Sequence, residues 1–206
     1  MFTVNHSVLV VRYLLFSLVL SLLSCGTTSP NYYNLPTFSD TYLNAVIEIP
    51  AGTNLKIEYN HKRNDFLPDQ RNHRDRYIDF LSYPGNYGFI PSTYSDPEKG
   101  GDGDALDILV LGESLATGTL QQVIPIGLLK LEDEGALDAK IIAVPAALED
   151  QMIKATSWQQ LVDNYPAVSD ILDRWFTNYD PDDETLVLGW GDEQEALEEI
   201  KKWQVY

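Results

Sequence analysis

Gly101-Asp102-Gly103-Asp104-Ala105-Leu106-Asp107 is the stretch around which the rest of the chain can be interpreted. It places three carboxylates within six residues, and its glycines permit the positive φ angles of a tight loop. Asp107 already belongs to the apolar run 105–111, which is typical of a buried strand. A carboxylate is costly to bury unless a cation or several hydrogen-bond donors compensate it. We therefore expect Asp102, Asp104 and Asp107 to converge on a hard divalent cation, Mg²⁺ or Ca²⁺.

This stretch has two other interpretations. A solvated acidic turn explains Asp102 and Asp104 equally well, because Asp-Gly pairs are common turn formers. It does not explain Asp107, which lies inside a hydrophobic strand. An EF-hand loop fits poorly, because the later glycine and the closing glutamate are missing at the required offsets.

The N-terminal segment has the pattern of a secretory signal. Residues 1–24 carry an apolar stretch that is too short for a membrane span and ends in small residues. Leu-Leu-Ser directly before Cys25 resembles the bacterial lipobox, which implies cleavage before Cys25 and acylation of this cysteine, the only one in the chain. An ordinary signal peptide or a single-span anchor is the alternative. The lipobox implies a protein held by lipid on the outer side of a bacterial membrane, in the cell envelope.

The remaining chain has the length of one domain. We expect residues 25–40 to be a flexible tether, because they are rich in Thr, Ser, Pro and Asn, and residues 41–206 to form the domain. The formal net charge is −17, and removing the signal deletes one arginine and no acid. Such an acidic protein does not bind nucleic acid through a basic surface. If its substrate is also an anion, metal ions must mediate between them.

Short strands followed by helices predict an α+β domain that is mainly β. We expect a small closed or partly closed barrel with the C-terminal helices packed on one side. The expected strands are 42–50, 56–59, 105–111, 123–131, 139–144 and 186–190, with a hairpin turn at 51–54, and helices are expected to start near Ser157, Pro166 and Asp192. Residues 60–76 are expected to form a polar loop, in which Lys62, Arg63 and Arg71 are solvated.

Several charged residues lie in or beside apolar β segments, where a strand does not account for them. They are Glu48, Lys56, Glu58, Asp107, Asp133, Asp138 and Lys140. A barrel brings such positions together, which predicts an acidic cage for several Mg²⁺ ions with cations that hold an anion. The sequence contains no Ser-His-Asp or Cys-His arrangement and no phosphate-binding glycine loop. Two metals that share a water lower its pKa and aim it at phosphorus, which points to phosphoryl chemistry.

These residues resemble the soluble family I inorganic pyrophosphatases. Asp102-Gly103-Asp104-Ala105-Leu106-Asp107 is close to the family's D-G-D-P-x-D signature, with alanine in place of proline. Other blocks follow in the family's order: Ile47-Glu48-Ile49-Pro50, Lys56-Ile57-Glu58, Tyr83–Ile90, Gly127–Lys130, Asp133-Glu134, Asp138-Ala139-Lys140 and Gly189-Trp190. The resemblance covers roughly residues 44–200. It implies a five-stranded OB-like closed barrel and Mg²⁺-dependent hydrolysis of inorganic diphosphate to two phosphates.

The resemblance also implies roles for single residues. Asp104 is the expected general base, which takes a proton from the attacking water. The expected metal ligands are Asp102, Asp107 and Asp138, with Asp133 and Glu48 for further metals, and Glu58 supports this network. The expected phosphate contacts are Lys56, Tyr87, Lys140, Tyr179 and Arg76, with Arg74 as the second choice for the arginine. Bacterial members of the family are usually oligomers, so a homo-oligomer is expected as well.

One position departs from the family pattern. Asp180 follows Tyr179 where the family usually has a lysine that contacts phosphate. A negative charge there repels diphosphate, unless a cation from the arginine loop replaces the lysine. Two alternatives to the enzyme therefore stay open: a pyrophosphatase-like module that binds metal and phosphate with weakened turnover, and an acidic Ca²⁺-binding surface lipoprotein.

Overall fold

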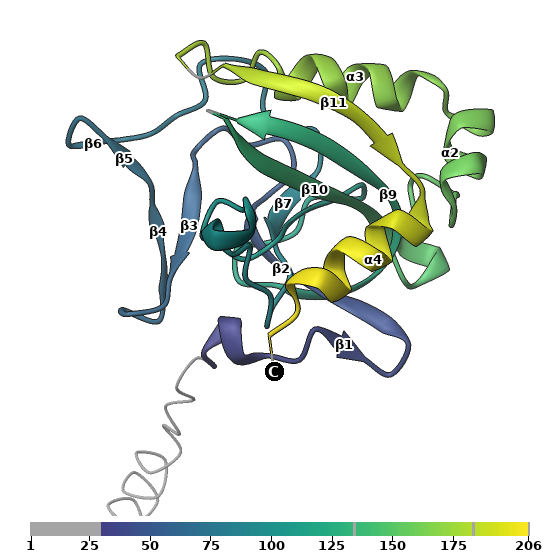
Figure 1. The fold of residues 1–206 in the computed structure, drawn as a ribbon, viewed down its shortest axis with the longest axis horizontal. Helices are drawn as coiled ribbons and strands as arrows, with labels where there is room; N and C mark the ends of the chain where they lie inside the picture. Colours follow the sequence, from purple (N-terminus) through teal and green to yellow (C-terminus); the bar gives the residue numbers. More distant parts are fainter. Residues whose placement is uncertain (1–29, 134, 183, 206) are drawn as a thin grey trace, which may run out of the picture.

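Five strands pair in a closed ring in the computed structural model, which describes residues 30–133, 135–182 and 184–205 (Figure 1). In ring order they are β2 (Tyr42–Ile49), β7 (Asn86–Phe89), β8 (Asp107–Val110), β10 (Ala136–Pro145) and β9 (Leu120–Asp133). β9 pairs back onto β2, which closes the ring, and β8 and β10 are its parallel pair. This arrangement confirms the predicted mainly-β barrel.

The central parts of the ring strands are buried on both faces, as the apolar runs in β2, β8, β9 and β10 predict. In β8, Ile108 and Val110 belong to one core cluster and Leu109 belongs to another, and none of the three is exposed. Helices cover the two faces. α2 (Trp158–Asn164) and α3 (Ala167–Phe176) pack on the Leu109 side, and α4 (Glu193–Trp203) packs on the Ile108 side, lying across β9 (Figure 1).

The helix ends follow the signals in the sequence. The Ser157 side chain accepts a hydrogen bond from the Gln160 amide at the start of α2, and Asp192 accepts from the amides of Gln194 and Glu195 at the start of α4. β11 (Thr185–Gly191) extends the sheet beyond β9. Two short 3₁₀ helices, η2 (Pro97–Lys99) and η3 (Leu148–Asp150), lie in the connections.

The predicted hairpin between the first two strands is wrong. β3 (Ile57–Asn60) pairs with β4 (Asp65–Pro68) rather than with β2. The backbone of the predicted turn is satisfied by a later segment, because the Ile78 amide donates to the Asn54 carbonyl at 2.7 Å. The predicted polar loop therefore contains β4 and a small hairpin, β5 (Gln70–Arg71) with β6 (Arg74–Asp75).

The described chain begins before the predicted domain boundary. η1 (Tyr32–Asn34) and β1 (Phe38–Ser39) occupy part of the predicted tether, and β1 pairs with β2. Tyr32 and Tyr33 pack against Tyr59, which explains why this segment folds onto the domain. The predicted signal and Cys25 lie outside the described residues. Within the described ranges, no helix is long and apolar enough to cross a membrane.

Candidate active site

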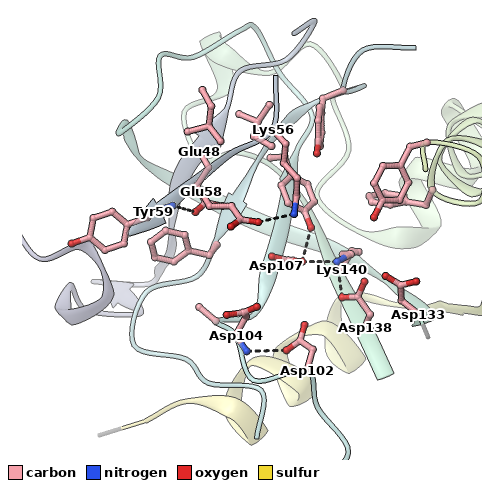
Figure 2. Close-up of a pocket in the computed structure, with 18 of the residues that line it drawn as sticks. Glu48, Lys56, Glu58, Tyr59, Asp102, Asp104, Asp107, Asp133, Asp138 and Lys140 are labelled. Carbon is pink, nitrogen blue, oxygen red and sulfur yellow. Dashed lines mark hydrogen bonds and ion pairs between the residues drawn. The ribbon is translucent and has the colours of Figure 1, made fainter. Parts of the chain in front are cut away.

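A cavity of about 630 Å³ opens where the ends of the ring strands meet the loop 101–107, which we call the aspartate loop. Figure 2 shows acidic side chains pointing into it from several elements. The cavity is lined by seven carboxylates, Glu48, Glu58, Asp102, Asp104, Asp107, Asp133 and Asp138, and by two lysines, Lys56 and Lys140. The structure thus brings together every acidic site residue that the sequence predicts.

Backbone hydrogen bonds, and the close approach of Gly101 to the backbone of Ser95, determine the shape of the aspartate loop. The Ser95 amide donates to the Asp104 carbonyl at 2.7 Å, and the Gly103 amide donates to the Ser95 carbonyl at 2.8 Å. The Asp104 amide donates to an Asp102 side-chain oxygen at 3.0 Å (Figure 2). A Cβ on Gly101 would lie 2.5 Å from the Ser95 carbonyl carbon, so no larger residue fits there without a shift of backbone. The loop therefore holds both carboxylates at the cavity.

Glu48 is the most deeply buried acid of the cavity. Its side chain accepts a hydrogen bond from the Tyr59 amide at 2.7 Å, across from β2 to β3. Burial raises the pKa of Glu48 to about 8, and the charges of Asp107 and Glu58 add to this effect. Glu48 therefore carries a proton at neutral pH unless a cation compensates it.

Burial and neighbouring acids also raise the pKa values of two acids in the aspartate loop. The pKa values of Asp102 and Asp104 are raised above their ordinary values, mainly by burial and further by the charge of Asp107. In Asp104, Glu58 contributes in the same direction. Burial and the charge of Asp107 together disfavour ionisation of Asp102 and Asp104 in the metal-free chain.

Lys140 bridges two of the predicted metal ligands. Its ammonium lies 2.5 Å from an oxygen of Asp107 and 2.5 Å from an oxygen of Asp138 (Figure 2). The Tyr87 hydroxyl donates to the same Asp107 oxygen at 2.5 Å. Burial disfavours the charge on Lys140, but the two carboxylates outweigh it and hold its pKa well above the ordinary value.

The donor set fits divalent metal ions. Within the part of the chain that the structure describes, no three acidic, histidine or cysteine side chains are already placed to hold one ion, and Lys140 occupies the space between Asp107 and Asp138. However, seven carboxylates face two lysines in one partly buried cavity. Oxygen ligands of this kind suit Mg²⁺ or Ca²⁺, and a divalent cation would favour the ionised form of these partly buried carboxylates.

The predicted phosphate contacts divide between two places. Lys56, Tyr87, Lys140 and Tyr179 line the cavity. Arg76 and Arg74 instead line a neighbouring hollow of about 480 Å³, and Tyr179 lines both. Lys56 lies 2.6 Å from Glu58, so this cation also has an acidic partner at the cavity wall (Figure 2).

The structure corrects the interpretation of Arg71 as a solvated residue. Arg71 lies 2.9 Å from Asp180, and Asp180 also forms an ion pair with Arg76. The negative charge of Asp180 is therefore compensated by the arginine loop. No local pattern signals these pairs, because more than a hundred residues separate the partners.

Sequence reasoning also missed part of the cavity wall. Tyr33 from η1, His61 from the turn after β3, and Trp175 from α3 contribute to the lining. The Tyr33 ring packs edge-on against Tyr59 with a centroid separation of 5.1 Å. The position of Tyr33 in the cavity wall could not be predicted, because it lies in a Pro- and Asn-rich segment with no regular apolar pattern.

The fold and the cavity together define a mainly-β barrel with an acidic site at the ends of its strands. Comparison with known proteins is consistent with this description. The model of the family described as inorganic pyrophosphatase matches residues 45–206. The inorganic pyrophosphatase of Saccharolobus solfataricus is 38% identical over 164 residues, which cover 78% of this chain and 88% of that protein. That of Neisseria meningitidis serogroup A is 36% identical and covers 78% and 85%.

Solved structures agree with the sequence comparison. The crystal structure of inorganic pyrophosphatase from Thermus thermophilus has a TM-score of 0.70 at 32% identity and covers 84% of this chain and 95% of that one. The type I inorganic pyrophosphatase from P. falciparum has a TM-score of 0.76 at 29% identity, and this chain covers 61% of its length. The chain belongs to the inorganic pyrophosphatase family, which confirms the resemblance seen in its sequence blocks.

Proposed function

We propose that this protein is an inorganic diphosphatase, which adds water to diphosphate and releases two phosphates. The observation that carries this function is the cavity in which seven carboxylates and two lysines converge, in a chain of this family. The family uses divalent metal ions, and we assign Mg²⁺ here because all seven acidic side chains offer hard oxygen ligands. Bound Mg²⁺ would neutralise the substrate and make a water nucleophilic near neutral pH.

The aspartate loop supplies the groups that would handle metal and proton. Asp102 and Asp107, with Asp138 from β10, would hold the metal ions near the attacking water. Asp133 and Glu48 would hold further ions. Glu58, which lies 2.6 Å from Lys56, would support this network of metal ligands. Asp104 would accept the proton from the water as its oxygen bonds to phosphorus, and the bridging P–O bond then breaks to release phosphate.

The lysines and tyrosines would orient the diphosphate. Lys56 and Lys140 supply positive charge to the cavity, and Tyr87 and Tyr179 supply hydroxyl donors. Burial raises the pKa of Tyr179 to about 12, so its hydroxyl keeps its proton at neutral pH and can donate to a phosphate oxygen. Arg76 would act from the neighbouring hollow, beside Tyr179. Charge on the departing phosphate is then met by fixed cations and donors.

We further propose that the protein is a lipoprotein anchored through Cys25 in the bacterial cell envelope. The Leu-Leu-Ser-Cys sequence after an apolar segment supports this location. Cys25→Ala should abolish labelling of the protein by a radioactive fatty acid without loss of phosphate release. Labelling of this variant would exclude Cys25 as the site of acylation. A homo-oligomer is proposed on the family resemblance alone, and sedimentation of the purified protein would test it.

The function is tested by phosphate release from diphosphate while Mg²⁺ is titrated. We expect rapid release that requires Mg²⁺ and stops when a chelator is added. Tight diphosphate binding without release would instead favour a binding module on the same fold. Stabilisation by Ca²⁺, with no response to Mg²⁺ plus diphosphate, would favour the calcium-binding alternative.

A further inference from the structure

A buried carboxylate joins two arginines beside the cavity. The Asp180 side chain, in the turn after α3, is 5% exposed. It lies 2.9 Å from Arg71, forms an ion pair with Arg76, and accepts a hydrogen bond from the Asp182 amide at 3.1 Å. A carboxylate at this depth is stable when charged donors surround it. Asp180 therefore ties the β5–β6 hairpin to a segment about a hundred residues away in the sequence.

This cluster continues to the wall of the cavity. Arg76 also pairs with Asp69 at 3.3 Å, and Asp69 lies 3.7 Å from the ammonium of Lys56. Backbone hydrogen bonds follow the same path, because the Lys56 amide donates to the Arg76 carbonyl at 2.9 Å and the Asp69 amide donates to the Lys56 carbonyl at 2.9 Å. Lys56 lines the cavity. A line of alternating charges thus connects Asp180 to a cation of the site.

Asp180 is also joined directly to another residue of the cavity wall. Tyr179 precedes it in the chain and lines both the cavity and the neighbouring hollow. The Tyr179 ring stacks on Trp175, with centroids 5.0 Å apart and an angle of 11° between the planes. Because Asp180 is fixed by two arginines, the backbone next to Tyr179 is fixed as well.

The two guanidinium groups need the carboxylate between them. Arg71 and Arg76 repel each other. Burial opposes ionisation of Asp180, but hydrogen bonds from Arg71, the Asp182 amide and Arg76 outweigh it and lower its pKa to about 2. Asp180 therefore stays charged at neutral pH. A neutral residue there would leave both arginines without this counter-charge.

We propose that Asp180 is a positioning residue: by holding Arg71 and Arg76, it fixes Lys56 and Tyr179 at the phosphate-binding wall of the cavity. This inference rests on the proposed diphosphatase function. Asp180 would therefore favour substrate binding, although its own charge has the same sign as that of diphosphate. Asp180 acts through its neighbours and need not touch the substrate.

The test compares Asp180→Asn with Asp182→Asn in the full chain purified in detergent. Asp182 has the same partner, Arg71, at 3.3 Å, but its side chain is 79% exposed. Loss of a buried charged hydrogen bond in Asp180→Asn should raise KM for Mg²⁺-diphosphate about tenfold or more, whereas kcat should change little. Asp182→Asn should change KM less than about twofold, because exposed ion pairs contribute little. Asp180→Glu should restore part of the affinity.

Substitution of Arg71 provides an independent test. Arg71→Ala should raise KM in the same direction, and the double variant Arg71→Ala/Asp180→Asn should be less impaired than the product of the two single effects. Additive effects would overturn the inference, as would a wild-type KM in Asp180→Asn, or a common loss of kcat and folding without a change in KM. If the wild-type chain itself releases no phosphate, the proposed function fails, and this inference fails with it.

Discussion

The electrostatic environment of Asp104 differs from that of the acids that form ion pairs with Lys140. Asp107 and Asp138 share the ammonium of Lys140 at 2.5 Å, whereas the raised pKa of Asp104 reflects burial and the negative charges of Asp107 and Glu58. A carboxylate with a raised pKa is a stronger base than an ordinary aspartate. This environment suits Asp104 for accepting a proton in the cavity.

Replacement of Asp104 by asparagine removes the base and keeps the shape of the side chain. We expect Asp104→Asn to lower kcat by about 10²- to 10⁴-fold, the usual contribution of general base catalysis. Phosphate release at saturating Mg²⁺ and diphosphate measures the effect. The exposed helix residue Asp163 provides the control, since Asp163→Asn should retain wild-type kcat. Near-normal turnover in Asp104→Asn would exclude Asp104 as the base.

Arg76 and Arg74 can be distinguished by the same assay. Arg76 has a largely buried side chain, 13% exposed, and pairs with Asp69 and Asp180, whereas Arg74 is exposed. Arg76→Ala should raise KM for diphosphate by about tenfold or more, because it removes a charged donor and one of the two arginines that pair with the buried Asp180. Arg74→Ala should stay within about twofold of the wild type. The reverse ranking would assign the phosphate contact to Arg74.

The strands and helices of this fold are mostly encoded by local sequence. Apolar runs predict four of the five ring strands, all except β7, and capping residues such as Ser157 and Asp192 predict the helix starts, because these signals act within a few residues. The β3–β4 pairing and the place of η1 were not predictable in this way, since both depend on aromatic packing around Tyr59. Likewise the carboxylates of the cavity were found from sequence, but the contact of Arg71 with Asp180 depends on the tertiary fold.

The pairing of β7 with β2 in the barrel depends on Gly88. A Cβ added to Gly88 would lie 1.9 Å from the Val46 carbonyl oxygen, so the strands would have to separate. We expect Gly88→Ala to lower the free energy of unfolding by about 3 kcal/mol, as in other overpacked sites. Gly52→Ala is the matched control, because Gly52 has φ +78° but no atom within 4 Å of an added Cβ. It should cost about 1 kcal/mol from backbone strain alone.

Urea denaturation of the two glycine variants separates crowding from backbone strain. If Gly88→Ala were no less stable than Gly52→Ala, the close approach of β7 and β2 would not limit the fold. A loss of stability in Gly88→Ala should also lower activity, because Tyr87, Glu48 and Asp107 lie on the three strands that meet there. The strands that pack closely at Gly88 therefore also carry residues of the site.

At the scale of the whole molecule, negative charge is concentrated as well as abundant. The chain carries a formal charge of −17, and seven of its acids face one cavity. Folding without metal raises the pKa values of four of them, Glu48, Asp102, Asp104 and Asp138, mainly through burial. Binding of divalent cations to the folded form adds stability in proportion to their affinity, about 2.7 kcal/mol at a hundred times the dissociation constant. Substrate, metal and fold are thus thermodynamically linked in this protein.

This linkage predicts an unusual pH dependence for the metal-free protein. The pKa of Glu48 is about 8 in the folded chain, mainly because of burial, and its ordinary value is 4.5. Between these values the folded state binds a proton that the unfolded state has lost, so stability falls as pH rises. The melting temperature in EDTA should therefore drop from pH 6 to pH 8, on the order of 5 °C, and Mg²⁺ should reverse most of this drop at pH 8.

Glu48→Gln is the matched control for the pH experiment, because glutamine keeps the shape of the side chain but does not titrate. It should flatten the drop between pH 6 and pH 8 in EDTA. Asp180 does not interfere, since its pKa is lowered to about 2 and its effect on stability is confined to acid below this window. A melting temperature that rises from pH 6 to pH 8 without metal, in the wild type, would contradict the buried, proton-binding state of Glu48. An unchanged slope in Glu48→Gln would assign the effect to the aspartates of the cavity instead.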